Sequence, residues 1–87
     1  MQNLSKYRLC STMDTTPSGK LLFLIMLDII NTDNSVIIPQ RRISEVLGIS
    51  KGTVSRNLQK LRDNGYINVI PQYHSDGGRA ANKYILK

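Results

Sequence analysis

Ile43–Ile67, with the sequence ISEVLGISKGTVSRNLQKLRDNGYI, is the stretch from which the fold of this chain follows. Gly48 stands where one helix ends and the backbone can turn through a left-handed conformation, which glycine adopts at no steric cost. Ser50 then supplies a side-chain oxygen that caps a second helix, and Gly65 ends that helix in turn. The stretch therefore predicts two short helices joined by a tight turn, followed at once by a strand over 66–70.

The second helix of this stretch, over residues 51–64, has two chemically different faces. Its apolar side chains recur at helical spacing, so one face is expected to be buried at Val54, Leu58 and Leu61. The opposite face carries side chains of the types that bond to phosphates and base edges: Thr53, Arg56, Gln59 and Lys60. A rigid helix that is buried on one side and meets a polyanion on the other predicts a DNA-reading element.

The net charge of the chain lies in the same half as this helix pair. The 87 residues include 12 lysines and arginines against 6 acids, which gives a net charge of +6. Residues 1–39 hold three basic and three acidic side chains, so residues 40–87 carry the whole excess with nine against three. Because 40% of the residues are hydrophobic, the chain can form one small core. We therefore expect a single basic domain with an anionic partner.

Several classes of function lack the residues that they need. Cys10 is the single cysteine, so no disulfide forms within the chain. His74 is the single histidine and has no Cys, His or acid at ligand spacing, and no catalytic triad or carboxylate pair is evident. The apolar run 21–27 is shorter than the ~20 residues that cross a bilayer. We expect a cytoplasmic protein that is not an enzyme, needs no cofactor or metal, and has no membrane partner.

The flanking sequence completes the order of elements. Residues 1–15 are polar and mixed, and they predict either an N-terminal arm over the core or a short strand at 6–10. Thr16 and Pro17 favour a helix start, so we expect the folded domain over residues 16–87, beginning with an apolar helix that runs to about Asn31. The elements expected beside the central stretch are a brief strand over 36–38, a helix opened by Pro39, a hairpin tip over 76–78 and a returning strand over 80–86.

Helical periodicity also predicts which side chains are buried. The expected buried faces are Leu21, Leu22, Ile25 and Ile29 on the first helix, and Ile43, Val46 and Leu47 on the helix after Pro39. Leu24 falls on the polar side of its helix, so it is covered by residues 4–10, covered by a second subunit, or simply exposed. Our hypothesis is a weak homodimer through this helix and the N-terminal segment.

Three segments of the chain resemble bacterial winged helix-turn-helix DNA-binding domains: Leu47–Ser50, Thr53–Arg56 and Leu61–Ile67. The segment Gly77–Tyr84 resembles the wing of the subset found in small regulators and in phage and plasmid replication initiators. The resemblance implies an α+β fold with a three-helix core, a short strand and a C-terminal β-hairpin wing. It also implies a transcriptional regulator that binds double-stranded DNA sequence-specifically, with helix 51–64 in the major groove and the 71–83 wing on the adjacent backbone or minor groove. The alternatives are a replication-initiation domain and a winged-helix adaptor between proteins.

Individual roles follow from side-chain chemistry. Arg56 can bind guanine in bidentate fashion and Gln59 can pair with adenine, whereas Gly52 lets the helix backbone approach DNA closely. Arg62 lies beside the buried face, so we expect a structural role for it. The complete predicted DNA-binding set is Arg41, Arg42, Ser50, Lys51, Gly52, Thr53, Ser55, Arg56, Gln59, Lys60, Arg79 and Lys83.

Four residues of this set are cations that lie outside helix 51–64. Arg41 and Arg42 begin a helix, where positive charge opposes the helix dipole, so they either bind phosphate or stay solvated. Arg79 follows two wing glycines, and the resemblance implies a position in or over the minor groove. Lys83 follows on the returning strand as a candidate phosphate contact.

Overall fold

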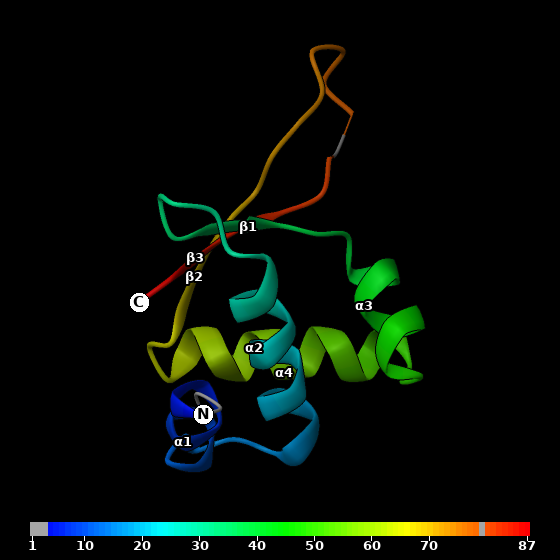
Figure 1. The fold of residues 1–87 in the computed structure, drawn as a ribbon. Helices are drawn as coiled ribbons and strands as arrows, with labels where there is room; N and C mark the ends of the chain where they lie inside the picture. The colour runs from blue at the N-terminus through cyan, green and yellow to red at the C-terminus, as the bar shows by residue number, and fades with distance from the viewer. Residues whose placement is uncertain (1–3, 79) are drawn as a thin grey trace.

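The computed structural model describes residues 4–78 and 80–87 and shows an α+β fold (Figure 1). Helices lie together below a small antiparallel sheet, and the loop between the last two strands extends away from the body (Figure 1). This arrangement confirms the predicted winged helix. The elements are α1 (Ser5–Ser11), α2 (Pro17–Ile29), β1 (Ser35–Ile37), α3 (Gln40–Leu47), α4 (Lys51–Asp63), β2 (Ile67–Ile70) and β3 (Lys83–Leu86).

The sheet has the order β1-β3-β2, with the C-terminal strand in the middle. Tyr84 of β3 pairs with Val36 on one side and Val69 on the other. Because side chains alternate along a strand, Tyr84 and Leu86 face the helices and are buried, and Lys83 lies on the opposite face. The returning strand is shorter than the predicted 80–86, since ladder pairing ends at the residue before Pro71, which has no N–H to donate.

The side of α2 that is buried differs from the predicted one. Leu22, Phe23 and Met26 are buried against the rest of the core, whereas Leu21 and Ile29 are 51% and 45% exposed. The prediction of Leu21 and Ile29 as core residues was therefore wrong. Apolar side chains surround most of this helix, so its own periodicity does not determine which side the neighbouring elements cover.

The N-terminal segment is a helix, and the short strand predicted at 6–10 was wrong. Helix α1 packs along α2, where the Cys10 thiol donates to the carbonyl oxygen of Lys20 and the Lys6 ammonium pairs with Asp28. Cys10 belongs to the buried core, and Leu24 is half-buried and packs against that core. The segment therefore covers α2 within one chain, as the predicted arm would.

The turn between α3 and α4 has the geometry that its sequence predicts. Gly48 has a φ of 66° and ends α3, and the Ser50 hydroxyl accepts a hydrogen bond from the Thr53 amide at 3.1 Å. Ile43 is fully buried, but Val46 is 56% exposed, so its predicted place in the core was wrong. The short helix α3 needs only Ile43 and the half-buried Leu47 to fill its interface with the core.

Candidate nucleic-acid interface

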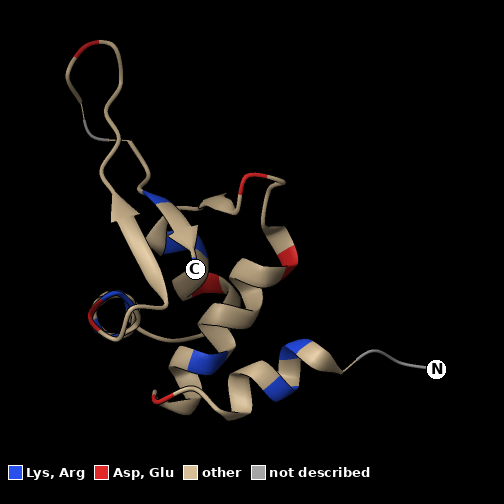
Figure 2. Cartoon of the chain, turned by 90° about the vertical axis from the view of Figure 1, so that its left-hand side faces the viewer, with Lys and Arg blue, Asp and Glu red and all other residues tan. Residues whose placement is uncertain are grey.

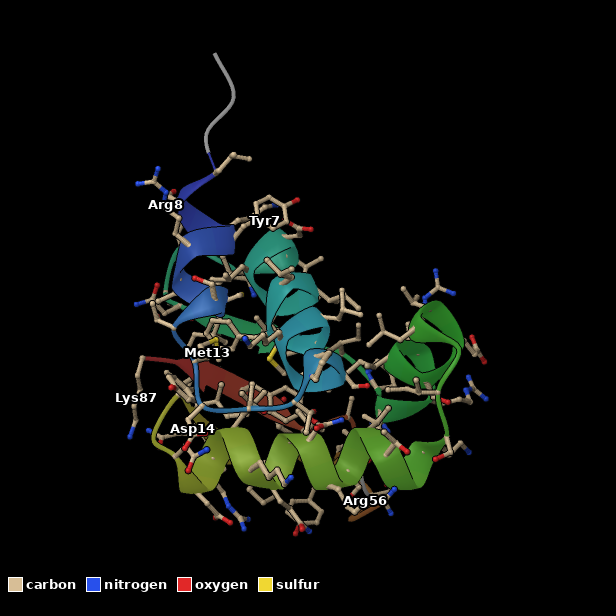
Figure 3. The ribbon with its side chains drawn as sticks, turned by 90° about the horizontal axis from the view of Figure 1, so that it is seen from below. Tyr7, Arg8, Met13, Asp14, Arg56 and Lys87 are labelled. Carbon is tan, nitrogen blue, oxygen red and sulfur yellow. The ribbon has the colours of Figure 1, made fainter. Side chains whose placement is uncertain are left out.

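Helix α4 separates a buried face from an exposed one. Val54, Leu58 and Leu61 are at most 4% exposed, as predicted. Arg56 projects from the opposite side of the helix, away from α1 and α2 (Figure 3). The outward positions Lys51, Gly52, Gln59 and Lys60 are also exposed, while Thr53 and Ser55 are half-buried. The face predicted to meet DNA is therefore open to solvent and is supported from behind by the core.

The first turns of α4 hold Arg56 in a hydrogen-bonded chain. The Ser50 oxygen lies 2.9 Å from the Thr53 hydroxyl, and the Arg56 guanidinium donates to that hydroxyl at 3.2 Å. The Ser50 cap that fixes the start of α4 thus also helps to orient the Arg56 guanidinium. This guanidinium keeps further N–H groups that can donate to a ligand. A Cβ at Gly52 would meet only Arg56 Nη1 at 3.5 Å and Ser50 Oγ at 3.9 Å, so packing does not require glycine there.

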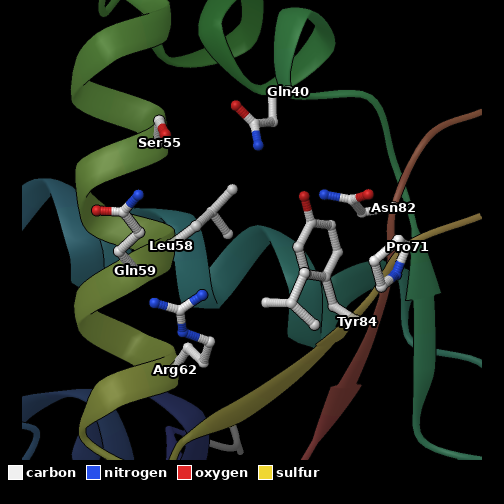
Figure 4. Close-up of a pocket in the computed structure, with 9 residues that line it drawn as sticks. Gln40, Ser55, Leu58, Gln59, Arg62, Pro71, Asn82 and Tyr84 are labelled. Atoms are coloured by element: carbon white, nitrogen blue, oxygen red, sulfur yellow. The ribbon is translucent and has the colours of Figure 1, made fainter. Parts of the chain in front are cut away.

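A groove of about 270 Å³ lies between the outward side of α4 and the base of the wing (Figure 4). It brings the predicted residues Ser55 and Gln59 together with Arg62, Gln40 and Asn82, which the DNA-binding set lacked. The Arg62 side chain is 53% exposed, and its only ion pair among the described residues is with Asp63 at 3.3 Å. Arg62 therefore lines this groove with an exposed side chain, and its expected structural role stays a prediction. Its position three residues after Gln59, on the same side of the helix, was the signal for this.

Arg41 and Arg42 lie at the start of α3 with most of their side chains exposed. Each guanidinium is 3.8 Å from a carboxylate oxygen of Glu45, one turn further along the helix. An exposed ion pair of this length contributes little free energy, so both side chains can exchange Glu45 for a phosphate. Sequence inspection had not included Glu45 as their partner.

The wing has an ordered tip. The His74 amide donates to the Gly78 carbonyl at 2.6 Å, and the Gly77 amide donates back to the His74 carbonyl at 2.9 Å. Gly77 has a φ of 89°, which explains the glycine at this position. Figure 2 shows the wing rising on the same side of the body as α4, which is seen end-on, with the N-terminal helices on the other side. Arg79 lies outside the described residues.

Lys83 lies on the sheet face that points away from the helices, in register with Ile37 and Ile70. The Lys83 charge helps to lower the pKa of Asp33, although hydrogen bonds from Ser35 to the carboxylate are the larger cause. Lys83 is therefore near an acid as well as near the wing.

Other chemistry is limited in the part of the chain that the structure describes. No group of three or more His, Cys, Asp or Glu side chains in residues 4–78 and 80–87 could hold a metal ion. Burial raises the pKa of the Cys10 thiol, which lowers its reactivity. Within the same residues, no helix is both long and apolar enough to cross a bilayer.

The fold is that of a winged helix-turn-helix domain, in which α4 is an exposed basic helix. In agreement, residues 32–68 match the protein-family model described as winged helix-turn-helix DNA-binding. The matched segment contains β1, α3, α4 and the start of β2.

One similar solved structure is described as a possible transcriptional regulator from Methanosarcina mazei Go1. It has a TM-score of 0.62 and 17% sequence identity, over 95% of this chain and 63% of that one. A likeness at this identity shows the shared fold, and the present chain spans less than two thirds of that protein. A search of curated proteins finds no match.

Proposed function

We propose that the protein is a transcriptional regulator that reads a specific duplex sequence with α4 in the major groove. The observation that carries this proposal is the structure of α4 itself. Its inner face is at most 4% exposed at Val54, Leu58 and Leu61, and its outer face presents guanidinium, amide and hydroxyl groups. Hydrogen-bond donors and acceptors on a rigid helix can distinguish base pairs in the major groove. The wing and the basic side chains around the helix then contact the phosphate backbone.

The regulatory part of the proposal is supported by the similar fold of a protein named as a possible transcriptional regulator. A replication-initiation domain would use the same interface at an origin, and an adaptor would bind DNA without sequence preference. The proposal describes binding in the cytoplasm, with no catalytic step. In-vitro selection of DNA by the purified protein separates the adaptor from the other two, because only a sequence reader enriches a motif.

Arg56 provides the direct test of base reading. Arg56→Ala should weaken binding to the selected sequence by about 1–3 kcal/mol, since a bidentate contact with guanine is lost, and it should weaken binding to unrelated DNA much less. Affinities for both DNAs are measured at one salt concentration. Arg8→Ala is the matched control, because Arg8 is an exposed arginine on α1. Equal losses on both DNAs would show that Arg56 contacts only phosphate.

We also propose that two copies associate weakly through α2 and α1. The specific observation is a pair of exposed apolar side chains on α2, Leu21 and Ile29, with the half-buried Ile25 one helical turn from each. Tyr7 on the neighbouring α1 is 50% exposed as well. In Figure 3, α1 and its Tyr7 lie on the other side of the molecule from Arg56, so a dimer through α1 would leave both recognition helices free.

A further inference from the structure

We infer that the start of α2 belongs to the DNA interface and that Ser18 and Lys60 hold one backbone phosphate between them. This inference rests on the proposed function. A hollow of about 220 Å³ separates the first turn of α2 from the outer flank of α4, and it lies apart from the groove beside the wing. The hollow is lined by Thr16, Ser18, Thr53, Arg56, Asn57 and Lys60.

The cations of the hollow are not neutralised by the protein. Arg56 and Lys60 are exposed, and neither makes an ion pair with any residue in 4–78 or 80–87. By contrast, Arg41, Arg42 and Arg62 each have a carboxylate within 4 Å. No acid lines the hollow itself. Two positive charges at one concavity, without a protein counter-ion, favour an anion from outside.

The acids nearest to the hollow lie beyond its edge. Lys60 also borders a neighbouring depression that contains Asp14 and Asp63. Asp63 already pairs with Arg62. These two carboxylates would repel a DNA strand that passed further toward the end of α4. Because of this repulsion, a phosphate would bind Lys60 on the side that faces Ser18.

The base of the hollow is rigid. The Thr16 hydroxyl donates to the Asn57 side-chain oxygen at 2.9 Å and accepts from the Gly19 amide at 3.1 Å. Asn57 is only 5% exposed, so these bonds join α2 to α4 beneath the hollow. A Cβ at Gly19 would lie 3.3 Å from Asn57 Oδ1, which shows how closely the two helices approach. These bonds hold the backbones of α2 and α4 in place beneath Ser18 and Lys60, so less ordering entropy is lost on binding.

The division of roles on α4 follows from this geometry. The Ser18 hydroxyl and the Lys60 ammonium donate to phosphate oxygens. Arg56 also lines the hollow, where its guanidinium donates to the Thr53 hydroxyl and keeps further N–H groups for a base edge. Phosphate contacts from α2 on one side of α4 and from the wing on the other would fix the angle at which α4 enters the major groove of DNA.

The test is Ser18→Glu, with Thr32→Glu as its matched control. Thr32 is an exposed hydroxyl residue beyond the other end of α2, so both variants change the net charge equally. Ser18→Glu should weaken binding to the selected and to unrelated DNA by about tenfold, the equivalent of one charge-assisted contact. Its slope of log K against log salt should become less negative by about 0.9. The melting temperature should not fall, because an acid is favourable in the first turn of a helix.

Lys60→Gln is the second variant. It should also make the slope of log K against log salt less negative by about 0.9. The ratio of its affinities for selected and unrelated DNA should stay constant. If Ser18→Glu weakens binding no more than Thr32→Glu does, the inference is wrong even though wild type binds DNA. A Lys60→Gln variant with an unchanged salt slope would overturn it too. Failure of wild-type protein to bind any duplex DNA would instead refute the proposed function.

Discussion

At the scale of single residues, the Thr16 hydroxyl caps its own helix and also bonds to Asn57, which lies 41 positions further along the chain. This hydroxyl caps α2 by accepting from the Gly19 amide, and the same hydroxyl donates to the buried Asn57 side chain. Capping was predictable from Thr16-Pro17. The bond to Asn57 was not, although Asn57 lies on the buried side of α4, three residues after Val54 and four before Leu61. Burial of an amide is tolerated because its oxygen has this partner.

Thr16→Ala should therefore lower the free energy of unfolding by about 1–2 kcal/mol, since it removes the cap and leaves the Asn57 oxygen without its donor. Thr16→Ser is the control, because it keeps the hydroxyl and should lose much less. Urea or guanidinium unfolding curves measure both. The assignment fails if the two variants have the same midpoint.

At the scale of elements, α4 combines a strong cap with a weak helix former at its second position. Gly52 is exposed, and an added Cβ would make only ordinary contacts. The helix would therefore gain stability from alanine at this position. A glycine that packing does not require is consistent with close approach of the helix backbone to DNA.

Gly52→Ala should raise the free energy of unfolding by up to about 1 kcal/mol and at the same time reduce DNA affinity. Gly48→Ala is the comparison for folding, because the φ of 66° at Gly48 makes the same substitution destabilising by about 1–2 kcal/mol. Thermal unfolding and titration with the selected DNA give the two quantities. An unchanged affinity would mean that Gly52 does not approach the backbone.

At the scale of the whole molecule, the excess positive charge lies on other elements than the exposed apolar side chains of α1 and α2. The helices α1 and α2 and the loop after them belong to the neutral residues 1–39, whereas α4 and the wing lie in the half that carries the +6 charge. A second copy can thus approach α2 without bringing the two basic faces together. Winged-helix dimers of this kind would read two half-sites.

The dimer is tested by sedimentation over a concentration series. Wild type should dimerise weakly, and Leu21→Lys should stay monomeric with unchanged stability, because Leu21 is half exposed. Leu24→Lys should instead be destabilised, since Leu24 packs against the core. Wild-type protein that remains monomeric at high concentration would contradict the dimer.

The sequence by itself determined the features whose physics is local. The cap at Ser50, the left-handed Gly48 and Gly65, and the buried face at Val54, Leu58 and Leu61 depend on backbone conformation and on helical spacing within a few residues. These local signals were sufficient to predict the helix pair, the strand after it, and the outward face of α4.

Only the tertiary structure decided which surfaces meet. The apolar helix α2 could have buried several sides, and its neighbours selected Leu22 and Met26 while leaving Leu21 exposed. Ser5–Ser11 became a helix that shares the core because α2 offered a surface for it. The hollow between Ser18 and Lys60 likewise exists only after α2 and α4 have packed. Such contacts join residues far apart along the chain, so no local pattern specifies them.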